Sequence, residues 1–285
     1  MSKIRIVTDT NASLPTHIVE KYGIIEVPIH IQFGDESYVT GVDIDDAKLF
    51  ELIDARKVLP TTAAPSPAAF HKAFDRAAAE GAEQVLCICC SSKVSATYQA
   101  ALMAAESFPD GVITIVDSLN LCLAEGFQVI AAAETVAKDV SMDAVLEAVH
   151  SIQARTHVFG ALPTLKYLAM GGRMGKLAAG FGETLNIKPI LTSKEGKLDL
   201  LEKVRTWRKA KQRLIELALE SSQGSEVERI GLIHVNNEAG VMALYDMIKE
   251  VLPISAEPIV ADFTPGLSVH TGSGVIGFVM VTKPD

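Results

Sequence analysis

One stretch, Val85 to Ala101 (VLCICCSSKVSATYQAA), constrains the fold more than any other part of the chain. It opens with an apolar run that ends at Cys90, which is typical of a short strand buried on both faces of a parallel sheet. Ser91 and Ser92 end this run, and Ser95 is expected to cap the helix that follows. Open α/β sheets bind small anionic ligands where hydroxyls and free N–H groups meet at a strand's carboxyl end. The alternative is a turn that is rich in serine only because serine caps helices.

Two other expected strands also end in polar residues. The strand from Ile4 to Val7 is followed by Asp9-Thr10, and the strand from Val112 to Val116 by Asp117-Ser118. Strands that alternate with helices form βαβ units and a mostly parallel sheet, in which all such strand ends lie at one edge. The coincidence of three polar ends is stronger evidence for a site than any one of them.

The remaining elements of the first half follow from local patterns. Ser13 and Pro15 are expected to begin a short helix. The sequence also predicts one strand over Ile24 to Phe33, helices over Ile44 to Arg56 and Leu119 to Lys138, and a stiff loop over Pro60 to Pro67 that opens a helix running to about Gly81.

After about residue 155, expected hairpins alternate with helices, as around Lys194-Glu195-Gly196. This change predicts an N-terminal α/β domain over 1–154 with a mostly parallel sheet and flanking helices. An α+β domain with a mixed sheet is then expected over 155–285.

Composition narrows the class of protein. The chain has 285 residues, a net charge of −9 and no uninterrupted apolar run near 18 residues. We therefore expect neither a membrane span nor a nucleic-acid surface. MSKIRIVTDT enters a strand without an apolar signal, so we expect a cytoplasmic protein. The four cysteines have neither CxxC nor zinc-site spacing, so buried reduced thiols and no metal site are expected.

Three motifs in the second half have a functional and a plainer interpretation. Gly272 to Gly277 matches GxGxxG, but a dinucleotide site needs a following helix and a later acid, and only a strand pattern remains. An approach of these glycines to another ligand group stays open, with a simple turn as the alternative. Gly171-Gly172-Arg173 places an arginine on a turn after a helix, where its planar fork suits a carboxylate or phosphate. The alternative is a helix C-cap followed by a surface arginine. His270 sits in a glycine-flanked loop, as a ligand contact or a surface histidine.

A basic segment stands out in an acidic protein. Six cations fall within eleven residues and no acid lies among them: Lys203, Arg205, Arg208, Lys209, Lys211 and Arg213. The segment is either a docking patch for an anionic partner or a solvated helix face.

Taken together, these pieces resemble the DegV family, bacterial proteins that bind fatty acids and present them to a fatty acid kinase. The resemblance covers nearly the whole chain in the family's order. It rests on Thr8-Asp9-Thr10 with Ser13-Leu14-Pro15, Val27-Pro-Ile, Phe33 to Tyr38, Pro60-Thr-Thr62, Pro65-Ser-Pro67, Ser91 to Gln99, Thr164 to Leu168, Gly171 to Met174, Leu185 to Leu191, Lys203-Val-Arg205 and His270 to Gly274.

The resemblance implies two α/β domains with the ligand head group between them, no cofactor, and no catalytic activity of the chain's own. The ligand would be one long-chain fatty acid such as palmitate, stearate or oleate, and the partner a fatty acid kinase catalytic protein. Thr62 and the Ser91-Ser92 pair match the hydroxyls that hold the carboxylate, and Ser92 is favoured. The remaining implied ligand residues are Arg173, His270 and Gly272, and the implied docking residues are Lys203, Arg205 and Arg208. His270 and Arg173 are the candidate cations, because hydroxyls cannot neutralise a carboxylate.

Two other classes of function compete with lipid binding. The hydroxyl cluster would also suit a phosphotransfer or acyl-transfer enzyme, but the chain has no P-loop, nucleophile elbow or metal-ligand set. A regulator acting on a protein or on DNA through the basic segment is the third, and the acidic pI near 5.3 disfavours DNA.

Overall fold

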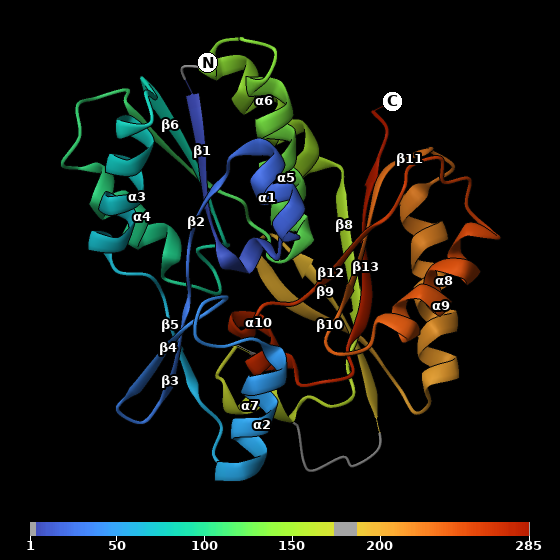
Figure 1. The fold of residues 1–285 in the computed structure, drawn as a ribbon. Helices are drawn as coiled ribbons and strands as arrows, with labels where there is room; N and C mark the ends of the chain where they lie inside the picture. The colour runs from blue at the N-terminus through green and yellow to red at the C-terminus, as the bar shows by residue number, and fades with distance from the viewer. Residues whose placement is uncertain (1–3, 174–186, 285) are drawn as a thin grey trace. The chain divides into compact units, whose positions relative to one another are not determined.

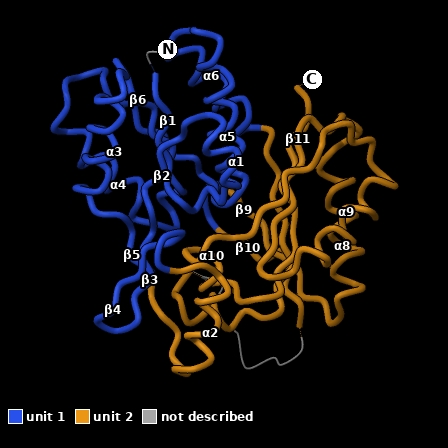
Figure 2. Tube along the Cα trace, viewed as in Figure 1, with its two compact units in different colours: residues 1–43, 62–154, 195–197 blue, residues 44–61, 155–194, 198–285 orange. Residues whose placement is uncertain are grey.

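The computed structural model describes residues 4–173 and 187–284. Met174, Leu185 and Asn186, which contribute to two of the motifs above, lie outside these residues. The chain divides into two compact units (Figure 2). Unit 1 comprises residues 1–43, 62–154 and 195–197, and unit 2 comprises residues 44–61, 155–194 and 198–285. Unit 2 therefore includes a segment from the first quarter of the chain.

Unit 1 is built on a four-stranded parallel sheet in the order β2-β1-β6-β7, beside a three-stranded sheet in the order β4-β3-β5 (Figure 1). Helices α3 and α4 pack on one face of the parallel sheet, and α5 packs on β1 and β6. The strands are β1 (Ile4–Asp9), β2 (Ile25–Val27), β3 (His30–Phe33), β4 (Glu36–Val39), β5 (Thr61–Ala63), β6 (Gln84–Cys89) and β7 (Ile113–Asp117). The helices are η1 (Thr10–Ala12), α1 (Thr16–Tyr22), α3 (Pro67–Ala79), α4 (Thr97–Ala105), α5 (Leu123–Val136) and α6 (Met142–Ala154).

Unit 2 contains a six-stranded mixed sheet in the order β10-β9-β8-β13-β11-β12. Its strands are β8 (Thr156–Ala161), β9 (Lys188–Lys194), β10 (Lys197–Val204), β11 (Val227–His234), β12 (Ile259–Asp262) and β13 (Ile276–Thr282). Its helices are α2 (Asp46–Arg56), α7 (Lys166–Met170), α8 (Trp207–Ser222), α9 (Glu238–Lys249) and α10 (Pro265–Thr271). The predicted mixed α/β fold class is therefore confirmed.

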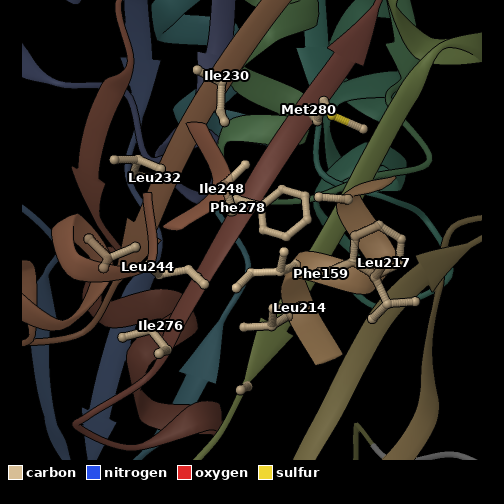
Figure 3. Close-up of a cluster of buried hydrophobic side chains, with 14 of the residues drawn as sticks. Phe159, Leu214, Leu217, Ile230, Leu232, Leu244, Ile248, Ile276, Phe278 and Met280 are labelled. Atoms are coloured by element: carbon tan, nitrogen blue, oxygen red, sulfur yellow. The ribbon is translucent and has the colours of Figure 1, made fainter. Parts of the chain in front are cut away.

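The core of unit 2 lies between its sheet and helices α8 and α9. Phe278 on β13 is fully buried and packs against Phe159 on β8, with ring centroids 5.5 Å apart. Leu214 from α8 and Leu244 from α9 complete the same cluster (Figure 3). Burying side chains of this size contributes roughly 1.5–3 kcal/mol each, so this cluster fixes β13 and the loop that precedes it.

The structure corrects the expected single strand from Ile24 to Phe33. β2 pairs with β1, whereas β3 pairs with β4 in the other sheet. Pro28 separates the two strands, because proline has no N–H for a strand ladder. The next N–H, that of Ile29, is bonded to Thr10 Oγ1 at 3.0 Å.

Several predicted helix starts and loops also differ from the structure. Neither Ser13 nor Ser95 is an N-cap: Ser13 ends η1, and α4 begins at Thr97 after Ala96. The helix expected from Leu119 begins only at Leu123, because the chain first takes left-handed conformations. The expected loop from Pro60 contains strand β5. The late start of α5 depends on a contact distant in sequence, from the N–H of Cys122 to the carbonyl of Asn11, which the sequence pattern could not show.

Candidate functional site

The polar strand ends of unit 1 do meet at one edge of the parallel sheet. β6 pairs with both β1 and β7, so the ends of the three strands are neighbours. Asp9 Oδ2 accepts the N–H of Cys90 at 2.9 Å, and Asp117 Oδ1 accepts the N–H of Ser92 at 3.2 Å. The prediction that these residues gather at one edge is therefore confirmed, and two carboxylates fix the backbone there.

The two serines at this edge have different environments. Ser91 is fully buried, and its hydroxyl donates to the carbonyl of Gly196 at 2.7 Å and accepts the N–H of Lys93 at 3.2 Å. Ser92 is exposed, and its hydroxyl has no hydrogen-bond partner among the described residues. Ser91 is therefore engaged in holding the loop, whereas the Ser92 hydroxyl is available to a ligand.

Two buried carboxyl groups, those of Asp9 and Glu125, lie at this edge, and only Asp9 was expected from the sequence. Glu125 on α5 is fully buried and its Oε1 accepts the hydroxyl of Thr8 at 3.2 Å. Burial, and then the charge of Asp9, raise the pKa of Glu125 well above its usual range. Burial also raises the pKa of Asp9 to about 6, against the lowering effect of its backbone hydrogen bonds. The available signal for Glu125 was an acid near the start of an otherwise apolar helix pattern.

A strained loop connects this edge to α5. Leu119 and Cys122 have φ values of 50° and 51°, which are unfavourable for residues with a side chain. The N–H of Cys122 is bonded to the carbonyl of Asn11 at 2.8 Å. A Cβ on Gly126 would lie 2.8 Å from the carbonyl oxygen of Ala12. The start of α5 is thus held tightly on the loop after β1.

All four cysteines are buried and reduced, as expected. Burial raises the pKa of Cys122 to about 12 and the pKa of Cys90 well above its usual range. Both groups are therefore neutral thiols at pH 7.

Thr62 lies in the middle of β5 and is half-buried. It therefore lies in a different sheet from β6, the strand that precedes Ser91 and Ser92, although all three residues are in unit 1.

In unit 2, three of the predicted ligand residues lie close together. Arg173 Nη1 donates to the carbonyl of Gly171 at 2.8 Å. A Cβ on Gly171 would lie 2.3 Å from Nδ1 of His270, so the imidazole rests against the backbone of Gly171. Gly272, with φ of 80°, packs tightly against the ring of Tyr167, because a Cβ there would lie 2.6 Å from two ring carbons. Only glycine at these two positions permits such packing.

The structure corrects the environment of His270. The residue lies in the last turn of helix α10 rather than in a loop. Burial, and then the guanidinium of Arg173, lower the pKa of His270 to about 4. The imidazole is therefore neutral at pH 7, which leaves Arg173 as the cation of this cluster.

The basic segment retains only part of its predicted charge. Arg213 is tied to Glu202, Glu216 and Glu220 at 2.6, 3.1 and 2.7 Å, so acids from outside the segment neutralise it. The three predicted docking residues are exposed: Lys203 on β10, Arg205 after it, and Arg208 on α8.

Two kinds of site are missing from residues 4–173 and 187–284. No three or more His, Cys, Asp or Glu side chains are grouped as a metal site would require. In the same residues, no helix combines the length and the apolar character that crossing a bilayer demands.

The structure defines a two-unit α/β protein. One unit has a parallel sheet with a hydroxyl-rich edge, and the other has a mixed sheet and a cluster of Arg173, His270 and Gly171. The family model described as "Uncharacterised protein, DegV family" matches residues 3–283. The chain belongs to the DegV family.

Individual relatives match almost end to end. A DegV domain-containing protein of Streptomyces coelicolor is 34% identical over 98% of this chain and 99% of its own length. A structure described as showing fatty acid binding of a DegV family protein from Thermus thermophilus has a TM-score of 0.90 and 31% identity, covering 98% of this chain and 99% of that one. DegV of Bacillus subtilis, described as a fatty acid binding protein, has a TM-score of 0.87 and 26% identity, covering 99% and 100%.

Proposed function

We propose that this protein binds one long-chain fatty acid and presents its carboxylate to a fatty acid kinase. The observation that carries the proposal is the close likeness, over 98% of the chain, to a Thermus thermophilus relative described as binding fatty acid. The kinase activity would belong to the partner.

The carboxylate would be held by neutral donors and one cation. The hydroxyls of Ser92 and Thr62 can donate neutral hydrogen bonds, and Arg173 supplies the positive charge that a buried carboxylate requires. His270, neutral at pH 7, would act as a hydrogen-bond donor that orients the head group. This division follows from the low pKa of the imidazole beside a permanent guanidinium.

The acyl tail would provide most of the affinity. Each buried CH₂ contributes about 0.8 kcal/mol, so a 16-carbon chain contributes on the order of 10 kcal/mol before association costs. A hydroxyl hydrogen bond contributes only about 1 kcal/mol net. Loss of a head-group contact should therefore misplace the carboxylate more than it weakens binding.

The proposal is tested by lipid mass spectrometry on purified, denatured protein. We expect one fatty acid per chain, such as palmitate, stearate or oleate. Native mass spectra that show only lipid-free protein, even after incubation with oleate and palmitate, would refute it.

Head-group placement is tested with His270→Ala loaded with the same fatty acid as the wild type. Most lipid binding should remain, while acyl-phosphate production at saturating kinase should fall. Equal rates would show that His270 has no part in presenting the carboxylate.

A further inference from the structure

Helix α10, which carries His270, is fixed at both ends by the end of strand β11. Before the helix, the N–H of Phe263 donates to the carbonyl of His234 at 2.8 Å. After it, the N–H of Gly274 donates to the carbonyl of Val235, also at 2.8 Å. The seven-residue helix therefore has fixed ends, and its rotation depends on what holds its middle.

A buried side-chain hydrogen bond holds the middle of α10. The hydroxyl of Ser268 donates to Asp46 Oδ2 at 2.7 Å, across 222 residues of sequence. Ser268 is fully buried and Asp46 is 7% exposed. The second oxygen, Asp46 Oδ1, is buried and has no hydrogen-bond partner among the described residues. The described hydrogen bonding of this carboxylate is thus directed to the helix that carries His270.

Ser268 and His270 lie on nearly opposite faces of α10, because two residues turn an α-helix by about 200°. α10 contacts α2 and α7, all of them in unit 2 (Figure 1). Asp46 begins α2, and Gly171, against which His270 rests, follows α7. A bond on one face of α10 therefore determines how the imidazole is placed on the other.

We propose that Asp46 is a positioning residue of the head-group site: through Ser268 it sets the rotation of α10 and so keeps His270 against Gly171 and beside Arg173. This inference rests on the proposed function for its meaning in ligand binding. The coupling between Asp46 and His270 can be measured without any ligand.

The surroundings of Asp46 also give this contact a pH dependence. Burial raises the pKa of Asp46 to about 7, and the nearby Asp262 and Asp45 also raise it, whereas Ser268 and His234 lower it. His234 Nδ1 is itself 2.6 Å from Asp262 Oδ1, so two of the groups that act on Asp46 are in contact with each other. As the pH rises through about 7, Asp46 becomes a full carboxylate and a stronger acceptor for Ser268.

The experiment uses the full chain and four variants: Ser268→Ala, Asp46→Ala, Asp46→Asn and Asp45→Asn. Asn at position 46 keeps an acceptor for Ser268 but does not titrate. Asp45 is exposed and caps α2 through the N–H of Lys48, a role that Asn also fills. Asp45→Asn therefore removes an adjacent charge without touching α10. The imidazole signals of His270 are followed by NMR from pH 3 to 8, a range that spans its lowered pKa of about 4, and bound oleate ¹³C-labelled at its carboxyl carbon reports the head group.

Ser268→Ala and Asp46→Ala should raise the titration midpoint of His270 by at least one pH unit and shift the carboxyl ¹³C signal, with less than about a fivefold change in oleate affinity. Asp46→Asn and Asp45→Asn should keep the wild-type midpoint. The wild type should also show a change in the carboxyl signal near pH 7 that Asp46→Asn lacks.

An unchanged His270 midpoint in Ser268→Ala, the mildest variant, would overturn the inference, as would an equal shift in Asp45→Asn. If the wild type binds no oleate, the proposed function fails, while the titration of His270 still decides whether Asp46 positions it. If Asp46→Ala does not fold, Ser268→Ala and Asp46→Asn still give the decisive contrast.

Discussion

The sheet edge of unit 1 and the Arg173–His270 cluster of unit 2 are assembled in different ways. At the sheet edge, side-chain carboxylates accept backbone N–H groups from the next strand, as Asp9 does from Cys90. In unit 2, two short helices meet through close contacts at Gly171 and Gly272. A parallel sheet brings its strand ends together by topology alone, whereas the second arrangement exists only if no Cβ intervenes. The stability of the sheet edge should therefore depend on pH. The packing in unit 2 should instead be disrupted by a single added methyl group.

The largest effect is expected from a methyl group at Gly277 on β13. A Cβ there would lie 2.4 Å from the carbonyl oxygen of Phe159, so Gly277→Ala should lower the free energy of unfolding by about 3 kcal/mol. Its register partner Gly160 is the matched control, because the atom nearest to a Cβ there, the carbonyl oxygen of Ile276, would be 3.9 Å away. Urea titrations should separate the two variants clearly. Equal urea midpoints for the two variants would show that the close contact at Gly277 does not determine the stability of unit 2.

The next effect is a pH dependence at the sheet edge. The pKa of Asp9 is raised to about 6 in the folded state, so the native protein retains a proton that the unfolded chain has lost. This proton contributes to the free energy of unfolding. The contribution is fully present below the pKa of Asp9 in the unfolded chain and is lost as the pH rises through 6. The stability of Asp9→Asn relative to the wild type should therefore increase by on the order of 2 kcal/mol between pH 4.5 and 7.

Urea unfolding of both proteins across this pH range measures the difference. Asp117→Asn is the control at the same edge: Asp117 Oδ1 accepts the N–H groups of both Ser92 and Leu119, and an amide oxygen can do the same. Its pH profile should match that of the wild type. If the difference in free energy of unfolding between Asp9→Asn and the wild type does not change with pH, burial does not raise the pKa of Asp9.

A smaller effect should separate the two serines. Ser91→Ala leaves the carbonyl of Gly196 without its donor and should lower the free energy of unfolding by about 1 kcal/mol. Ser92→Ala should leave stability unchanged, because no described residue bonds its hydroxyl, but it should alter the carboxyl ¹³C signal of bound oleate. The reverse pattern would exchange the roles that we assign to them.

The smallest effect concerns the exposed basic residues. Arg205→Ala should leave lipid binding intact and reduce acyl-phosphate formation with a kinase roughly three- to tenfold at low salt, since such charges mainly set the rate of encounter. Lys249→Ala is a matched control, because Lys249 is an exposed cation on α9, paired with Asp246 at 2.6 Å and outside the segment. Unchanged kinase rates in Arg205→Ala would exclude a docking role.

The contrast between the two regions also explains what the sequence could predict. Strand ends such as Asp9 and Ser92 were found because a buried parallel strand is a local pattern and its topology does the rest. Helix α10 was missed because Ser268, Val269 and His270 lie between glycines, and its formation depends on Asp46 and β11. Glu125 was missed because its environment depends on Thr8 and Asp9, far away in the chain.

The same distance in sequence has a consequence for biosynthesis. Helix α2 leaves the ribosome early, but the residue that bonds Asp46 follows 222 positions later. At roughly 5–20 residues per second, α2 waits on the order of ten to forty-five seconds for its partner. During that time α2, whose Leu49 and Ile53 are buried in the folded protein, lacks its contact with α10. The bond that holds the middle of α10 therefore forms only after most of the chain has been synthesised.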